Sequence, residues 1–278
     1  MADLYAVLSS ILIGTADFAG GFFSRRLSVY AVIGVSTTVA AIVFFAMGVK
    51  AGGATFTTAD IEAGLVTGVT VLLGTILYFK ALTKGRMGVI GGIVTMLVLV
   101  PIFFSVLHGE SLSTKTIIGI VLTLGGAILL GYPEMRGGTA VSAIAMAVGA
   151  AFMFGLSQVA LDLGAKNDTY SVLFISEVFQ AVVIGCLALA TRSTGGVTRK
   201  DLFPLACIGL ADAVAVSLFA AATKTGDLAV VSVLASLDPI VIALLAMVIL
   251  KERLLLIQRL AFVTVIIGSI MVGRNGGG

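Results

Sequence analysis

Residues 110–131 read ESLSTKTIIGIVLTLGGAILLG, and residues 252–273 read ERLLLIQRLAFVTVIIGSIMVG. Each stretch opens on a glutamate, continues as a largely apolar run, and has a glycine 21 positions after the glutamate. The two align without a gap, which indicates an internal repeat built from apolar helices. Matching residues inside the repeat are Leu112 with Leu254 and Gly126 with Gly268.

The composition of the whole chain is that of a membrane protein. Hydrophobic types make up 59% of the 278 residues, charged types only 11%, and the mean hydropathy is +1.18. Soluble domains carry about 45–50% apolar and about 25% charged residues. Because so few charges cannot cover a water-exposed surface, the composition excludes a soluble enzyme, a nucleic-acid-binding protein and a disordered chain. The net charge of +3 is small and indicates no particular partner.

The apolar residues gather into ten windows of membrane-crossing length, about 20 residues each. These continuous runs exclude a β-barrel, whose short strands alternate between apolar and polar residues. The first window has no basic residues before it, so we expect an uncleaved first span. The predicted fold class is an all-α membrane protein with ten transmembrane helices. The windows are roughly 4–23, 30–49, 63–82, 88–107, 114–131, 139–158, 169–190, 202–222, 228–249 and 255–273.

The repeat extends over both halves of the chain. Ala81-Leu-Thr-Lys84 matches Ala221-Ala-Thr-Lys224, and a glycine follows each. We therefore expect one five-helix unit at 1–131 and a second at 139–274. Because five is odd, the second unit enters the membrane from the opposite side. Such inverted repeats are typical of secondary transporters, in which rocking of the two units gives alternating access to a site between them.

Several short motifs support this interpretation. Asp17-Phe-Ala-Gly-Gly21 precedes Arg25 and Arg26. Both repeats also carry a turn that contains a glutamate, and in the second repeat its sequence is Leu250-Lys-Glu-Arg-Leu254. The whole pattern resembles the drug/metabolite transporter superfamily in its ten-helix, two-repeat EamA-like form. The other residues that carry the resemblance are Ser236-Leu-Asp-Pro239, Gln258, Gly268, Ala81-Leu-Thr-Lys-Gly85 and His108-Gly-Glu110.

The resemblance implies a multi-pass transporter of a small metabolite or drug, in a bacterial inner membrane, with both termini inside. Two features depart from the family pattern. Asp238 stands where an uncharged residue is expected, and Pro101 and Pro239 lie at different distances before their glutamates, so the two prolines are not equivalent. We expect both prolines to kink or hinge their helices.

Four carboxylates lie well inside predicted spans, at Asp17, Glu177, Asp212 and Asp238. An acidic residue at a helix centre costs about 2.5–3.5 kcal/mol on the insertion scale, so such groups face a wet cavity, are protonated, or pair with cations. We predict that these four bind substrate or protons. The structural alternative is that each hydrogen-bonds or pairs with a neighbouring helix, and that Asp238 caps the helix that Pro239 begins.

Other polar residues within the spans are candidates for the same site. Lys80, two positions after Tyr78, either extends to the membrane interface or pairs with a cavity carboxylate or an anionic substrate group. Gln158 ends a polar helix face and is a candidate cavity residue, as is Tyr78. Glu110 and Glu252 are expected to cap the helices that follow them.

Chemistry of other kinds is sparse in this sequence. Cys186 and Cys207 lie in apolar runs and are expected to pack rather than to form a disulfide. A single histidine, His108, argues against a histidine-based metal site, and the chain has no Gly-rich phosphate loop. Gly209-Leu-Ala-Asp212 matches an intramembrane aspartyl protease poorly, because an alanine replaces the second glycine. We expect no cofactor, no metal and no enzyme activity.

Two lines of reasoning give opposite orientations of the chain in the membrane. If the N-terminus is inside, the inside segments hold five basic residues and the outside segments hold twelve. The positive-inside rule therefore favours termini on the outside, whereas the family resemblance implies termini on the inside.

The leading hypothesis is a secondary transporter of a small organic molecule. The excess of acids favours a cationic or zwitterionic substrate, or proton-coupled export. The alternatives are proton-independent facilitation of a sugar or other neutral metabolite, and a divalent-cation permease or channel. Expected partners are the substrate, protons and the lipid bilayer, with no nucleic acid, for a monomer or homodimer.

Overall fold

The computed structural model describes residues 1–50, 56–107, 113–136, 141–164, 168–191, 195–225, 234 and 237–273. Every regular element within these residues is a helix. The elements are α1 (Ala2–Phe23), α2 (Val29–Lys50), α3 (Thr58–Lys84), α4 (Met87–Val94), the 3-10 helix η1 (Thr95–Val98), α5 (Leu99–Leu107), α6 (Thr114–Arg136), α7 (Val141–Gly164), α8 (Thr169–Thr191), α9 (Arg199–Thr225), α11 (Asp238–Ile249) and α12 (Leu256–Gly273).

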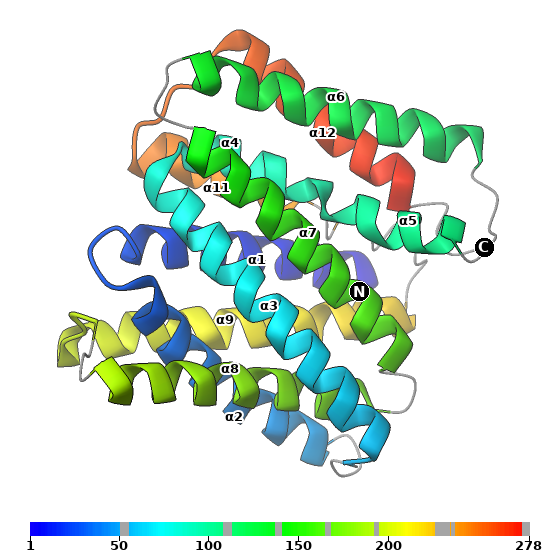
Figure 1. Cartoon of the computed structure of the whole chain (residues 1–278). Helices are drawn as coiled ribbons and strands as arrows, with labels where there is room; N and C mark the ends of the chain where they lie inside the picture. The colour runs from blue at the N-terminus through cyan, green and yellow to red at the C-terminus, as the bar shows by residue number, and fades with distance from the viewer. Residues whose placement is uncertain are drawn as a thin grey trace.

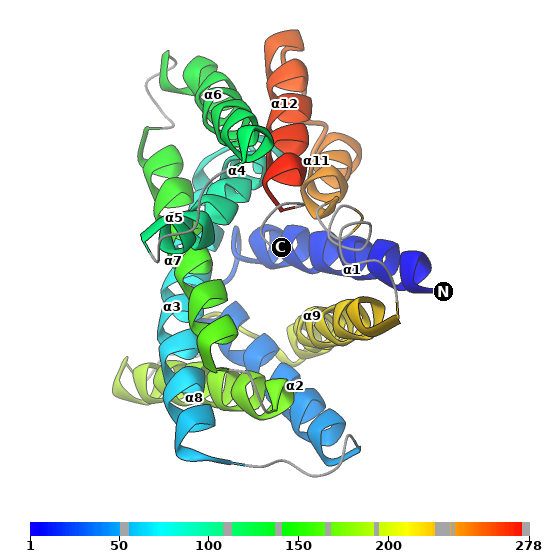
Figure 2. The ribbon, with the colours of Figure 1, turned by 90° about the vertical axis from the view of Figure 1, so that its right-hand side faces the viewer.

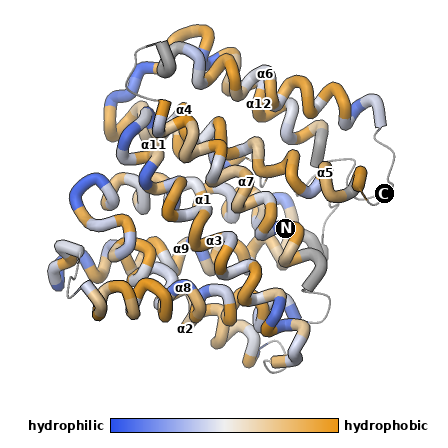
Figure 3. The backbone as a smooth tube through the Cα atoms, in the orientation of Figure 1, coloured by the Kyte–Doolittle hydropathy of each residue, from blue (hydrophilic) through white to orange (hydrophobic). Residues whose placement is uncertain are grey.

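Eight apolar helical segments in the described part are long enough to cross a membrane, with the stretch from α4 into α5 counted as one. Helices α11 and α12 are apolar but shorter. Hydrophobic residues dominate along the helices, and hydrophilic residues gather at several of the turns (Figure 3). The all-helical membrane fold is thus confirmed. The number of ten stays a prediction, because much of the window 228–249 lies outside the described residues.

The fourth predicted span is interrupted about one turn before Pro101. The proline ring excludes a hydrogen bond to the carbonyl four residues earlier, at Leu97. One turn of 3-10 helix, over Thr95–Val98, lies between α4 and α5. The break therefore falls on the turn just before the proline.

The helices pack mainly between the two halves of the chain (Figures 1 and 2). Helix α1 packs on α9 and α3 packs on α7, while α2 packs on α8 and α6 packs on α12. Exchanging each helix for its counterpart in the other half turns the α1–α9 pair into the α7–α3 pair and leaves the other two pairs unchanged. The pairing thus has the symmetry expected of a two-repeat fold.

Polar side chains tie three turns together at one end of the helices. The Glu252 carboxylate, between α11 and α12, accepts hydrogen bonds from the backbone N–H groups of Met87 (3.1 Å) and Gly88 (3.3 Å), at the start of α4. Arg25, after α1, lies 3.6 Å from the same carboxylate. Glu252 was expected to cap α12, and that prediction was wrong. Gln258 does so instead, accepting from the N–H of Leu255 at 3.0 Å.

The glycine at position 209 lets α9 and α2 approach closely. A methyl group added there would overlap the backbone carbonyl of Ser36 on α2, which cannot rotate away as a side chain could. By contrast, a methyl group at Gly125 on α6 would meet nothing within 4 Å. The spacing of α2 and α9 therefore depends on the missing side chain at Gly209.

We expect Gly209→Ala to destabilise the protein by about 1–3 kcal/mol, the usual cost of overpacking. Gly125→Ala is the matched control and should be neutral or slightly stabilising, since alanine is the better helix former. Apparent melting temperatures of the purified variants in detergent would test this. Equal melting temperatures for the two variants would contradict the argument.

Glu252→Ala should lower the free energy of unfolding by about 2 kcal/mol or more, because it removes two hydrogen bonds to a charged acceptor and an ion pair. Glu62→Ala changes an exposed glutamate on α3 and should have no such effect. The same melting experiment compares them. An unchanged melting temperature for Glu252→Ala would show that the link between the halves contributes little.

Candidate functional site

A cavity of about 220 Å³ lies among helices α1, α2, α3, α7, α8 and α9. It is therefore built from both halves of the chain. Its walls combine acidic, hydroxyl-bearing, amide and aromatic side chains with small residues. The residues that line it are Ala16, Asp17, Ile33, Ser36, Thr37, Ala40, Val71, Thr75, Phe79, Phe154, Glu177, Gln180, Ile208, Gly209 and Asp212.

Three of the four predicted carboxylates line this cavity: Asp17 from α1, Glu177 from α8 and Asp212 from α9. The fourth, Asp238, begins α11 and is not among the lining residues. Its backbone carbonyl lies against Gly14 of α1, where an added methyl group would be only 2.6 Å away. Because Gly14 is one helical turn before Asp17, this close contact brings the Asp17 and Asp238 carboxyl groups within electrostatic range.

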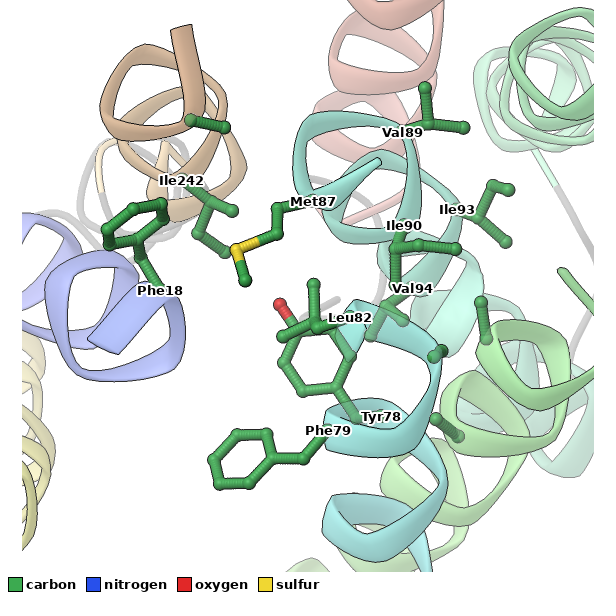
Figure 4. Packing of buried hydrophobic residues seen from close by; sticks show 14 of the residues in the cluster. Phe18, Tyr78, Phe79, Leu82, Met87, Val89, Ile90, Ile93, Val94 and Ile242 are labelled. Carbon is green, nitrogen blue, oxygen red and sulfur yellow. The ribbon is translucent and has the colours of Figure 1, made fainter. Parts of the chain in front are cut away.

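Tyr78 is close to Asp17 but is not among the residues that line the cavity. Its hydroxyl lies near the Asp17 carboxyl. The side chain is only 2% exposed, and Figure 4 shows its hydroxyl pointing toward the part of the core that holds Met87. Asp17 thus lies between the buried Tyr78 side chain and the cavity.

Lys80 does not join the acids. Its ammonium donates a hydrogen bond to the hydroxyl of Tyr30 on α2 at 2.9 Å and lies 5.0 Å from the centre of the same ring. None of the described residues that line the cavity is basic. The cavity therefore carries acidic groups without a protein cation among those residues.

Two further candidates lie elsewhere. Gln158, on α7, is exposed and is not among the lining residues. Pro101 lies in α5, and Pro239 lies in the first turn of α11, where a missing N–H costs no helical hydrogen bond. Among the described residues, no group of three histidine, cysteine or acidic side chains is arranged to hold a metal ion.

Sequence reasoning did not single out several of the lining residues. Gln180 follows Glu177 by three positions, a spacing that puts both on one helix face and could have identified it. The hydroxyl pair Ser36 and Thr37 interrupts an otherwise apolar span, which is a weaker signal. Phe79 and Phe154 have no distinguishing signal, because aromatic residues are ordinary in apolar helices.

Comparison with known proteins gives a family and a fold. Residues 1–132 and 141–274 each match the EamA-like transporter family. A solved structure described as "Crystal structure of protein" is similar over 97% of this chain and 95% of its own chain, with a TM-score of 0.67 and 18% sequence identity. At that identity the likeness shows the fold alone. No curated protein sequence matches the chain.

Two positions on α3 allow a test of whether the cavity holds water. Thr75 lines the cavity, whereas Leu73 is exposed and is not among the lining residues. In a background with Cys186→Ser and Cys207→Ser, Thr75→Cys should react with aminoethyl methanethiosulfonate at least about tenfold faster than Leu73→Cys, because the reaction needs a thiolate in water. Mass spectrometry of membranes after timed labelling gives the rates. Faster labelling at Leu73→Cys would contradict a wet cavity.

Proposed function

The chain belongs to the EamA-like transporter family, and we propose that it is a proton-coupled secondary transporter of a small organic cation. Family membership and the apolar helices make it an integral, multi-pass membrane protein with a small-molecule substrate. The cation class, the proton coupling and alternating access between the two halves are the proposal. It is carried by one observation: three carboxylates line a cavity whose described walls hold no basic residue.

Charge is the first support for a cationic substrate. Carboxylates that share a site repel one another when ionised, so the site favours groups that bring positive charge. The available cations are a proton and a substrate ammonium. Since Lys80 is hydrogen-bonded to Tyr30, it leaves the acids of the cavity to a ligand.

Size and wall chemistry limit the substrate further. Pockets for drug-sized ligands occupy about 300–1,000 Å³, so a cavity of about 220 Å³ fits a small metabolite better than a large drug. Phe79 and Phe154 supply aromatic walls, and an organic cation gains from contact with aromatic faces. These features favour a small amine over a sugar.

Competition for the same carboxylates gives a mechanism for coupling. A protonated acid cannot pair with an ammonium group, and an ion-paired acid does not hold a proton. If one cavity is exposed in turn to each side of the membrane, a substrate that displaces a proton on one side is itself displaced by a proton on the other. The result is exchange of protons for substrate, driven by the proton gradient.

We expect isoamylamine, a small alkylamine, to bind the purified protein and to release protons into a weakly buffered solution, which a pH-sensitive dye reports. Its affinity should fall as pH falls, because the carboxylates become protonated while the amine stays charged. Asp17→Asn and Asp212→Asn should each weaken binding at least about tenfold, through loss of a charge-assisted contact. Asp3→Asn, an exposed position on the same helix as Asp17, is the control.

Three outcomes would count against the proposal. Binding without proton release would favour proton-independent facilitation. Unchanged affinity in both cavity variants would remove the site assignment. In proteoliposomes with equal pH on both sides, exchange of labelled isoamylamine should exceed the leak through protein-free liposomes, and conductance in place of exchange would indicate a channel.

A further inference from the structure

The amide of Gln180 is a buried donor that has no hydrogen-bond partner among the described residues. The side chain, on α8, is 1% exposed and lines the cavity. Its Nε2 lies near the Glu177 carboxylate, but it has no hydrogen-bond geometry toward that or any other described group. A buried N–H left unpaired is costly, so such a group is rare unless water or a ligand completes it.

The rest of the described cavity wall offers mainly acceptors. Asp17, Glu177 and Asp212 carry carboxyl oxygens. The Ser36 hydroxyl donates within its own helix, to the carbonyls of Val32 and Ile33 at 2.9 and 3.0 Å. While it keeps these bonds, its oxygen accepts from a ligand and does not donate to it.

Thr37 behaves in the same way, since its hydroxyl donates to Gly34 at 3.4 Å. Against these acceptors the Gln180 amide brings two N–H groups. Even if one turned toward Glu177, the other would remain for a ligand. The Thr75 hydroxyl, on α3, also lines the cavity and can donate or accept. The wall thus presents mainly acceptors, with donors at Gln180 and Thr75.

The donor lies close to one of the acids. Glu177 and Gln180 are three residues apart on α8, so their Cβ atoms are about 5–6 Å apart on the same face. A ligand whose ammonium group pairs with Glu177 or Asp212 has its next few atoms beside the Gln180 amide. An acceptor on the ligand within a few bonds of the nitrogen would meet that amide.

We propose that Gln180 is a specificity-determining residue, which selects small amines that carry a neutral hydrogen-bond acceptor close to the ammonium group. Amino alcohols and amino amides are the class that fits. A plain alkylamine leaves the amide unpaired, and a zwitterionic amino acid brings a carboxylate among three others. The inference rests on the proposed function, because it assumes that the acids hold the amine.

Three ligands separate these cases. Leucinol carries an amine and a neighbouring hydroxyl, the methyl analogue has a methyl group in place of that hydroxyl, and leucine has a carboxylate there. The wild-type protein should bind leucinol about tenfold more tightly than the methyl analogue, and leucine most weakly. A site that hydrogen-bonds a ligand rejects the analogue that lacks the group, because its own polar atom is then left unpaired.

The variants Gln180→Leu and Gln180→Met remove the donor at similar side-chain volume. Each variant should still bind the methyl analogue. Its affinities for leucinol and for the methyl analogue should be about equal. Gln158→Leu, at the exposed glutamine on α7, should keep the full preference. The ratio of the two affinities, measured by isothermal titration calorimetry, is insensitive to a general loss of stability.

The possible results are distinct. Equal affinity of the wild-type protein for leucinol and the methyl analogue overturns the inference, since water then completes the amide equally well in both complexes. A preference that survives in both Gln180 variants also overturns it. If the wild-type protein binds neither amine, the proposed function fails together with the inference. If the methyl analogue binds and releases protons but no preference exists, only the inference fails.

Discussion

A carboxylate inside a membrane-spanning helix must keep contact with water or find a partner, because ionised groups are poorly tolerated in hydrocarbon. The arrangement of this bundle follows from that constraint. Asp17, Glu177 and Asp212 come from three helices, two of them in the second half of the chain, and they line a single cavity. The buried Tyr78 hydroxyl lies near the first of them. The acids are thus grouped rather than scattered over the lipid-facing surface.

Close helix packing makes that grouping possible. Small residues allow membrane helices to approach without a hydrophobic driving force between them. Gly209 sets the spacing of α2 and α9 beside Asp212, and Gly14 sets that of α1 and α11 beside Asp17. At each place the glycine is within one helical turn of an acid. The glycines that permit close helix packing therefore lie next to the acids that the packing brings together.

Much of this architecture was predictable from the sequence, and the reasons for the exceptions are physical. Helix positions follow from apolar runs of bilayer length, and the break before Pro101 follows from proline sterics. The cap that Glu252 provides to α4 was not predictable, because it joins residues 165 positions apart whose meeting depends on tertiary packing. Lys80 illustrates the same limit, since its partner Tyr30 lies on another helix. The spacing of Gln180 from Glu177 places both on one face of a helix, but it does not show that this face lines a cavity.

The pairing of helices across the two halves has a consequence for biosynthesis. Helix α1 packs mainly on α9 and α11, α2 packs on α8, and α6 packs on α12. When the ribosome has completed α6, most surfaces of the first half still lack the partners that will cover them, since the second half has not yet been made. Domains usually fold as they emerge, but here the first five spans must remain in the bilayer in a loosely associated state. Final packing, and with it the cavity, awaits the last helices to be inserted.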